Sequence, residues 1–175
     1  NIATKGITSV TLGTSNFVAG VNAGNSIVSG GIYNTVVGDE AGTAITTGTR
    51  NTAVGYGSLD ATTTGDKNTS IGGSALTNNT TGENNTGLGF SALQLNTTGT
   101  RNIAVGYDSL RSNTTGANNT SLGTSSLFTN TTGQKNTALG QGALYSSTTA
   151  SDNTAIGNDA LFANTTGTNN VATGM

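Results

Sequence analysis

The sequence contains no His, Cys, Trp or Pro. Without His and Cys it lacks the usual general base, thiol nucleophile and soft metal ligands. Only 8% of its 175 residues are charged and the net charge is −2, whereas disordered chains usually carry a high net charge. Six Lys and Arg residues are too few for the basic surface that phosphate binding needs. We therefore expect an ordered protein that is not an enzyme, holds no cofactor or metal and binds no nucleic acid.

Long apolar runs are also missing. No stretch approaches the roughly 20 apolar residues that a membrane-spanning helix needs, and no secretory leader is recognisable at the start. We expect no membrane insertion of this segment. The sequence ends at Met175, just after a repeat has begun, so we expect a processed product or a fragment of a longer fibre.

What the sequence has instead is a pattern with a fixed 17-residue period. Its first part is Asn-Thr-Ala-Val-Gly, as at residues 51–55. A second part pairs a small residue with Leu, as in Ser58 and Leu59, and a third is Thr-Thr-Gly, which only Ala150 interrupts. The consensus is N-T-A-V-G-x-x-A-L-x-x-N-T-T-G-x-x. The first-position residues are Asn34, Asn51, Asn68, Asn85, Asn102, Asn119, Asn136, Asn153 and Asn170.

A fixed period without insertions predicts that each repeat follows one path and stacks on the next. Seventeen residues at about 3.3 Å each suffice for a small two- or three-sided coil. We therefore predict an all-β fold, a parallel β-solenoid of 17-residue coils over residues 34–175. The handedness is left open, and the segment x-x-A-L-x-x fits either a second strand or a short helical turn.

Two apolar columns are expected to meet inside the coil, namely the Leu column and the aliphatic residue at the fourth repeat position. Gly at the fifth and fifteenth positions suits corners of the chain. The first-position Asn side chains are expected to form a structural ladder of amides that holds the register. The fourth-position residues are Val37, Val54, Ile71, Leu88, Val105, Leu122, Leu139 and Ile156.

The first 33 residues follow a different spacing, because Asn16, Asn25 and Asn34 lie nine residues apart. We therefore divide the chain at this point. Residues 1–33 are predicted to be a β-segment of shorter period or a cap, and residues 34–175 the repeat solenoid. Alternatively, the start of the chain contributes a strand to a neighbouring molecule.

Self-association is expected from the composition of one coil. Its few large apolar side chains do not offset the entropy that is lost when the whole coil is ordered. Stacking on other coils and contact with further copies of the chain supply more burial. We predict a homotrimer in which the Leu column or the fourth-position column faces the shared axis.

The motif NTAVG, with its variants NTSIG at 68–72 and NTAIG at 153–157, resembles the NSVAIG-type signature of the YadA-like heads of trimeric autotransporter adhesins. It is equally similar to the NTAVGxxAL repeats of bacterial and phage fibre proteins. The resemblance covers residues 34–174 and, more loosely, 16–33. It implies β-rolls that trimerise at a cell surface or on a virion fibre and bind host matrix or cells. Adhesin heads, however, have a shorter period than the repeats of this chain.

The variable repeat positions are expected to face outward, and they carry most of the rings and charges. Six rings fall into two columns, one directly after the strand Gly and one directly after Leu. Such rings can stack on sugars or on a protein surface, but we favour packing between coils or across a trimer seam. The first column holds Tyr56, Phe90 and Tyr107, and the second holds Phe128, Tyr145 and Phe162.

Three further columns raise other functions. Cations at the last repeat position are expected to be solvated rather than to bind acidic glycans. The Thr-Thr-Gly motif suggests ice binding. Adjacent Thr residues in a strand point to opposite faces, however, so only one file of Thr side chains faces outward. The Asn-Thr-Thr sequences match the N-glycosylation pattern, although their fixed phase favours a turn or ladder role. The cations are Arg50, Lys67, Arg101 and Lys135, and the Asn residues are Asn79, Asn96, Asn113, Asn130 and Asn164.

Catalytic and phosphate-binding motifs are not indicated. The carboxylate pairs Asp39 with Glu40 and Asp108 with Asp159 lie at variable, outward positions. The Gly-rich segments lack the Lys and the strand-to-helix context of a phosphate loop.

These patterns favour a structural or adhesive segment of an extracellular fibre that presents an extended surface to a host protein, matrix or glycan. The alternative is a subunit of an extracellular filament that assembles by end-to-end stacking or strand donation. Ice binding is a third interpretation.

Overall fold

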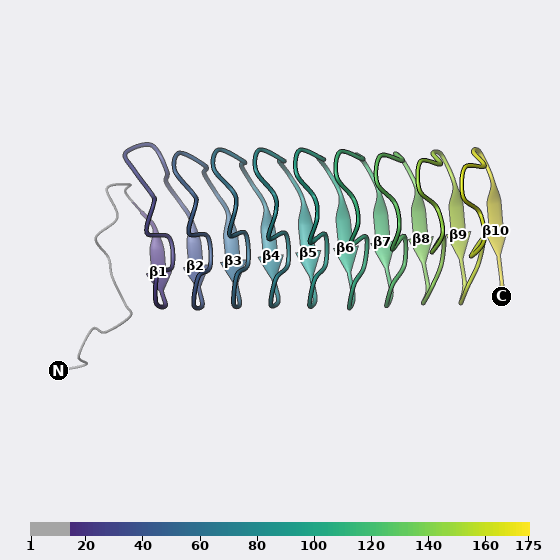
Figure 1. Ribbon diagram of the computed structural model, residues 1–175, viewed down its shortest axis with the longest axis horizontal. Helices are drawn as coiled ribbons and strands as arrows, with labels where there is room; N and C mark the ends of the chain where they lie inside the picture. The colour runs from purple at the N-terminus through teal and green to yellow at the C-terminus, as the bar shows by residue number, and fades with distance from the viewer. Residues whose placement is uncertain (1–14) are drawn as a thin grey trace.

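The computed structural model describes residues 15–175, which form a single stack of coils (Figure 1). Ten strands pair in parallel, in chain order, and build one sheet along the stack. Paired residues occupy the same position in adjacent repeats, as Thr52 and Thr69 do, so the predicted all-β parallel solenoid is confirmed. At about 4.8 Å per step, nine steps make a rod about 43 Å long. The strands are β1 (Phe17–Ala19), β2 (Thr35–Val37), β3 (Thr52–Val54), β4 (Thr69–Ile71), β5 (Thr86–Leu88), β6 (Ile103–Val105), β7 (Thr120–Leu122), β8 (Thr137–Leu139), β9 (Thr154–Ile156) and β10 (Val171–Thr173).

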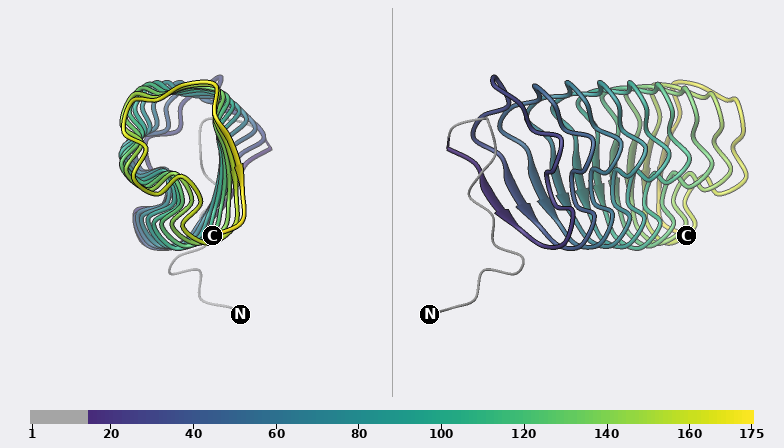
Figure 2. Two further views of the ribbon diagram at one scale, coloured as in Figure 1. Left: turned by 90° about the vertical axis from the view of Figure 1, so that its right-hand side faces the viewer. Right: turned by 60° about the vertical axis from the view of Figure 1, so that its left-hand side comes forward.

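Each coil has one straight wall, formed by the strand, and one indented wall of turns (Figure 2). The x-x-A-L-x-x segment belongs to the wall of turns, so it is neither the second strand nor the helical turn that its length allowed. Its backbone nevertheless bonds to the next coil. The Leu59 N–H donates to Ala75 O at 3.1 Å and the Ala61 N–H to Thr77 O at 2.9 Å. Hydrogen bonds between coils therefore run around most of the contour.

Residues with positive φ form the corners of the coil. Gly106, directly after β6, has a φ of 133°, and a Cβ there would lie 2.6 Å from Gly123 O. Both the torsion and the close approach of the next coil therefore require Gly. Leu110 has a φ of 51°, which costs an L-residue about 1–2 kcal/mol. Its side chain is fully buried, and this burial offsets the torsional cost.

The interior of the coil is narrow and packs small strand residues against the Leu column. The middle residue of each strand faces inward, and Ala53, Ala104 and Ala138 are fully buried. The Leu column is also fully buried from Leu59 to Leu144. The Leu column therefore lies inside a single coil, where it cannot face an axis shared with other copies.

The fourth-position column faces outward, so its predicted place inside the coil is wrong. Ile71, Leu122 and Ile156 are 43%, 49% and 43% exposed. Alternation puts the first and third residues of a strand on one face, and the narrow interior accepts only the small middle residue. We call the outward first and third residues of β2–β9 the outer sheet face. It carries the aliphatic file of the fourth position beside a Thr file made of Thr35, Thr52, Thr69, Thr86, Thr120, Thr137 and Thr154, with Ile103 in β6.

Residues 16–33 form one coil of the same stack, so the predicted shorter period does not apply to them. β1 pairs with β2, and the Asn34 N–H donates to Asn16 Oδ1 at 2.8 Å across 18 residues. Asn25, halfway between them, is exposed. The nine-residue spacing is therefore not a coil length. Residues 1–14, which contain the proposed strand-donating start, lie outside the described residues.

The first two coils fill the core with Ile in place of Leu. In the second coil, Gly42 and Ile45 stand where later coils have Leu and Asn. Ile45 is fully buried, and a Cβ on Gly42 would lie 2.7 Å from Ile45 Cδ1. Gly24 and Ile27 repeat this arrangement in the first coil. The Ile side chain thus takes the space of the missing Leu.

The opposite orientations of two Leu residues allow a matched test of the core. Leu110→Ala removes a fully buried side chain and is expected to lower the free energy of unfolding by about 2–5 kcal/mol. Leu122→Ala truncates a side chain that is 49% exposed and is expected to cost less than about 1 kcal/mol. Urea unfolding of both variants, at several protein concentrations to separate any effect of association, gives the comparison. Equal losses would contradict the assigned orientation.

Candidate functional site

The first-position Asn side chains form a continuous buried ladder, the first ladder. Asn102 Oδ1 accepts the backbone N–H and the side-chain amide of Asn119 at 3.0 and 3.2 Å. Asn102 Nδ2 donates to Asn85 Oδ1 at 3.2 Å and to Gly116 O, near the end of its own coil, at 2.8 Å. Every donor and acceptor of the amide is used. Bonds of this kind join all nine predicted ladder residues, from Asn34 to Asn170, and extend back to Asn16.

The Asn residues at the twelfth repeat position form a second ladder. Asn96 Nδ2 donates to Asn79 Oδ1 at 2.8 Å, and Asn113 Nδ2 donates to Asn96 Oδ1 at 2.7 Å. The carbonyl of Gly99 accepts from both ladders, at 3.1 Å from Asn96 and 2.8 Å from Asn85. Asn79, Asn96 and Asn113 are fully buried, so the folded rod hides them from a glycosylating enzyme. This geometry agrees with the ladder role, one of the roles predicted for the Asn-Thr-Thr sequences.

The first ladder predicts a large cost for Asn102→Ala. The Asn119 N–H would lose its partner, at about 1–3 kcal/mol for a buried orphan group. Gly116 O and Asn85 Oδ1 would each lose one of two bonds and keep the other, so we expect a total loss of roughly 2–5 kcal/mol. Asn78→Ala is the control, because the Asn78 side chain is exposed. Chemical denaturation measures both. A loss for Asn102→Ala no larger than that for the control would contradict the role of the ladder.

The aromatic residues form stacks along the outside of the rod. In the second aromatic column, Phe128 and Tyr145 have ring centroids 5.1 Å apart with an interplanar angle of 6°. Tyr145 and Phe162 stack at 4.9 Å and 10°. In the first column, Phe90 and Tyr107 stack at 5.8 Å and 12°. A ring covered by its neighbours has less of its face left for stacking against a sugar.

Arg111 continues the second aromatic column toward the N-terminus. Its guanidinium carbon lies 5.7 Å from the centroid of the Phe128 ring. Its Nε donates to Gln94 Oε1 at 3.0 Å and lies 3.5 Å from Asp108 Oδ1. Stacked or bonded side chains therefore run over five successive coils, from Gln94 to Phe162.

Tyr56 lies outside these stacks, beside the carboxylates of the early coils. A side-chain hydrogen bond with Glu40 and the negative charge of Glu40 raise the pKa of Tyr56, and Asp39 and Asp60 add to the effect. The Tyr56 side chain is 60% exposed, so salt and water screen these charges. Glu40, one of the carboxylates considered for catalysis, thus interacts with a phenol.

Glu40→Gln is expected to lower the pKa of Tyr56, because it removes the negative charge and replaces the carboxylate acceptor with a weaker amide oxygen. Since the pKa is raised in the folded state, this interaction favours folding below the ordinary Tyr pKa of about 10 and is lost as pH rises through the folded pKa. Tyrosinate absorbance during an alkaline titration measures the effect, and Tyr56→Phe identifies the transition. An identical titration of Tyr56 in both proteins would contradict the interaction.

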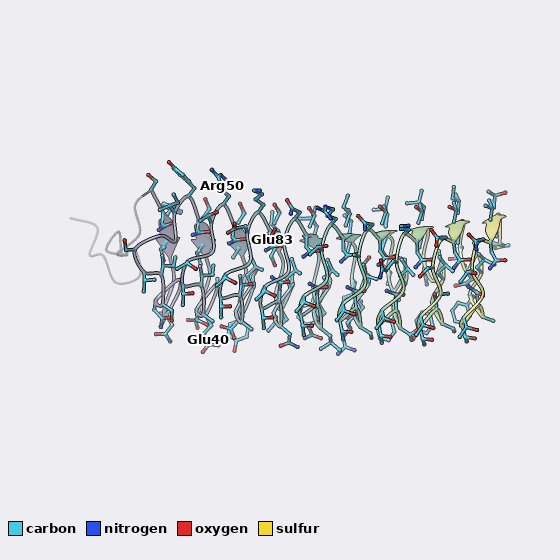
Figure 3. All side chains as sticks on the ribbon, turned by 90° about the horizontal axis from the view of Figure 1, so that it is seen from above. Glu40, Arg50 and Glu83 are labelled. Carbon is cyan, nitrogen blue, oxygen red and sulfur yellow. The ribbon has the colours of Figure 1, made fainter. Side chains whose placement is uncertain are left out.

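The predicted cation column lies exposed at a corner of the coil. Its members Arg50, Lys67, Arg101 and Lys135 have φ values of 58°, 57°, 57° and 54°. The Arg50 guanidinium packs over the Tyr33 ring at 5.7 Å. Arg50 and Glu40 project from opposite edges of the rod (Figure 3). Asp152 occupies the same repeat position as the cations, so this edge is of mixed charge.

The Thr-Thr-Gly motif exposes one file of Thr side chains. The Thr97 hydroxyl donates to Thr114 O of the next coil at 3.0 Å, and Thr80 and Thr114 bond in the same way. Thr98, the next residue along the chain, is exposed. The first Thr of the motif therefore bonds adjacent coils, and only the second offers a surface.

Clusters of metal-ligand side chains and membrane-spanning helices are both absent from residues 15–175. Over 15–175, no three Asp or Glu side chains gather closely enough to hold a metal ion. The same residues form no helix that would cross a membrane.

Comparison with known proteins gives no significant match. No protein-family model matches this sequence, and no curated protein and no solved structure is significantly similar to it. The resemblance to YadA-like heads therefore stays a prediction that depends on the NTAVG-type motifs alone.

Proposed function

We propose that this chain is a structural, non-enzymatic segment of an extracellular fibre, at a cell surface or on a virion, that presents an extended surface to cells, matrix or glycans. The observation that supports this proposal best is the division between a repeated interior and a variable exterior. Ladders, Leu and small residues are buried in coil after coil, whereas rings and charges lie outside. Such a rod suits a role that needs length and a large contact surface.

The outer sheet face supports a homotrimer as the assembled form. Parallel sheets are usually covered on both faces, whereas here Ile71, Leu122 and Ile156 are 43–49% exposed. No Asp, Glu, Lys or Arg occurs in strands β1–β10. An uncharged, partly aliphatic face about 34 Å long is the kind of surface that identical copies bury around a symmetry axis. In this trimer the rods lie parallel, with their aliphatic files toward the axis.

Such an arrangement leaves the wall of turns free for recognition. That wall carries Phe128, Tyr145 and Phe162, whose stack continues into Arg111. Ring edges and a guanidinium are common contact groups in recognition surfaces. The proposed contact with a host protein or glycan therefore lies along this column, opposite the self-association face.

Charge placed on the outer sheet face is expected to prevent the trimer. Ile71→Lys with Leu122→Lys puts six like charges near the axis of a trimer, so we expect monomers with an unchanged circular dichroism spectrum. The control is Thr81→Lys with Thr132→Lys, which adds the same charge at exposed positions of the Thr-Thr-Gly motif. Sedimentation velocity measures the mass of each protein. The control and the original chain are expected to remain trimeric.

Other outcomes separate the proposal from its alternatives. An original chain that is monomeric at all concentrations would refute the trimer. Electron microscopy that shows indefinite filaments instead of discrete short rods would favour the filament subunit, assembled by end-to-end stacking or strand donation.

Ice binding is a second candidate, favoured by the Thr file of the outer sheet face. Within the described residues, the hydroxyls of Thr52, Thr69 and Thr86 bond to no group of the chain. Hydroxyl and methyl groups that repeat about every 4.8 Å on an uncharged face suit the surface of a crystal such as ice. A monomeric rod that shapes growing ice crystals, and loses this effect with the two Lys substitutions, would favour ice binding over the trimer.

A further inference from the structure

The second ladder is interrupted near the C-terminal end of the rod. From Asn79 to Asn130, each Asn bonds the one before it at 2.7–3.0 Å. The next coil, residues 136–152, carries Ser147 at this position, and the coil after it returns to Asn164. Asn164 Nδ2 donates to Gly167 O at 3.0 Å, but its bond to the preceding coil is gone. The second ladder therefore breaks on both sides of coil 136–152.

The break leaves two buried polar atoms without partners. Asn130 Oδ1 and Ser147 Oγ are the buried side-chain atoms of residues 15–175 that form no hydrogen bond. Both residues are fully buried. An unsatisfied buried group loses its bonds to water and gains none in the fold. At this coil boundary the second ladder therefore contributes no bond and leaves two unsatisfied groups, while the Phe128–Tyr145 ring stack and a bond from the Thr129 hydroxyl to Tyr145 O at 2.7 Å still cross it.

Other departures from Asn at this position leave no such gap. In coil 51–67 the residue is Thr62, whose hydroxyl donates to Asn79 O at 3.0 Å and accepts from Asn79 Nδ2 at 3.3 Å. In the second coil it is Ile45, which has no polar side-chain atom and fills the core. The unpaired atoms are thus specific to Ser147.

Ser147 occurs together with Ala150, and one steric conflict links the two residues. A Cβ on Gly99 or Gly116 would overlap the side-chain oxygen of the Asn three residues earlier, Asn96 or Asn113. It would also lie close to the backbone oxygen of the Gly one coil later, which the backbone must shift to avoid. An Asn at the twelfth position therefore excludes any side chain at the fifteenth. Ala150 is the one residue other than Gly at that position in the repeat region, and a shorter residue at 147 makes room for its methyl group.

We propose that coil 136–152 is a built-in opening point, at which the rod separates into two cooperative sections instead of fraying evenly from its end. In repeat proteins, stability is a sum of the units and of the contacts between neighbours, so the weakest boundary opens first. The first ladder continues across this coil, from Asn136 to Asn153 at 3.2 Å, and holds the rod together between openings.

Hydrogen exchange of the full chain tests the opening point. Thr131 N–H donates across the weak boundary to Thr148 O at 2.8 Å, and Thr80 N–H donates across an intact one to Thr97 O at 2.9 Å. These amides occupy the same repeat position. Two unsatisfied groups correspond to an opening constant about thirtyfold larger or more. We therefore expect Thr131 to exchange at least about tenfold faster than Thr80.

Two double substitutions separate the break from the distance to the chain end. Ser147→Asn with Ala150→Gly restores the ladder and is expected to slow exchange of Thr131 by about tenfold or more. Asn96→Ser with Gly99→Ala copies the break into the middle of the rod and is expected to accelerate exchange of Thr80 by a similar factor.

The restored variant decides the outcome even if the copied break prevents folding. Unchanged Thr131 exchange in a folded restored variant would overturn the proposal. Failure of that variant to fold would overturn it as well, because an Asn side chain in place of Ser147 would then not fit the ladder. The assay is independent of assembly, adhesion and ice binding, so its failure is distinguishable from a failure of the proposed function.

Discussion

The fold depends on a buried Asn amide that bonds in two directions at once. Within its own coil, the side chain of Asn102 bonds to Gly116 O and so ties the start of the coil to its end. Along the rod, it bonds to Asn85 and Asn119. Because a buried amide without partners is costly, both the length of a coil and its position over the next are constrained by the same group. The repeats from residue 34 onward accordingly keep one constant length, whereas the coil of residues 16–33 makes the same two bonds with one residue more.

Once the amides and Leu side chains occupy the interior, sequence variation is confined to positions that leave the stack intact. Where the middle strand residue is Ser, a second Ser meets it: Ser58 Oγ donates to Ser70 Oγ at 2.7 Å, and Ser109 to Ser121 at 2.8 Å. Interior changes thus come in compensating pairs, as at Gly42 with Ile45. Exterior changes meet no such condition. The surface of the rod can therefore diversify without loss of the fold.

The period, the parallel stacking and the line of first-position Asn residues follow from spacing alone, because equal intervals place equal residues above one another. The spacing did not show which face of each strand points inward. Alternation groups Thr52 with Val54 against Ala53, but only the narrow width of the interior shows that Ala53 is the inner residue. The nine-residue spacing of Asn16, Asn25 and Asn34 was misleading because only two of the three lie on the ladder. The link between Ser147 and Ala150 could not be predicted either. It depends on how close two side chains lie at one corner of the coil, and the spacing of residues in the sequence does not give that distance.

The identity of the coils also bears on how such a molecule changes during evolution. Each middle coil offers to its successor the same carbonyls and amides that it meets in its predecessor. Unequal recombination between repeats in the gene would therefore insert or delete a whole coil and leave the pattern of backbone bonds and first-ladder bonds in place. The length of the rod would change in steps of about 4.8 Å. A lineage could adjust the length of the rod by copy number, without redesigning any residue.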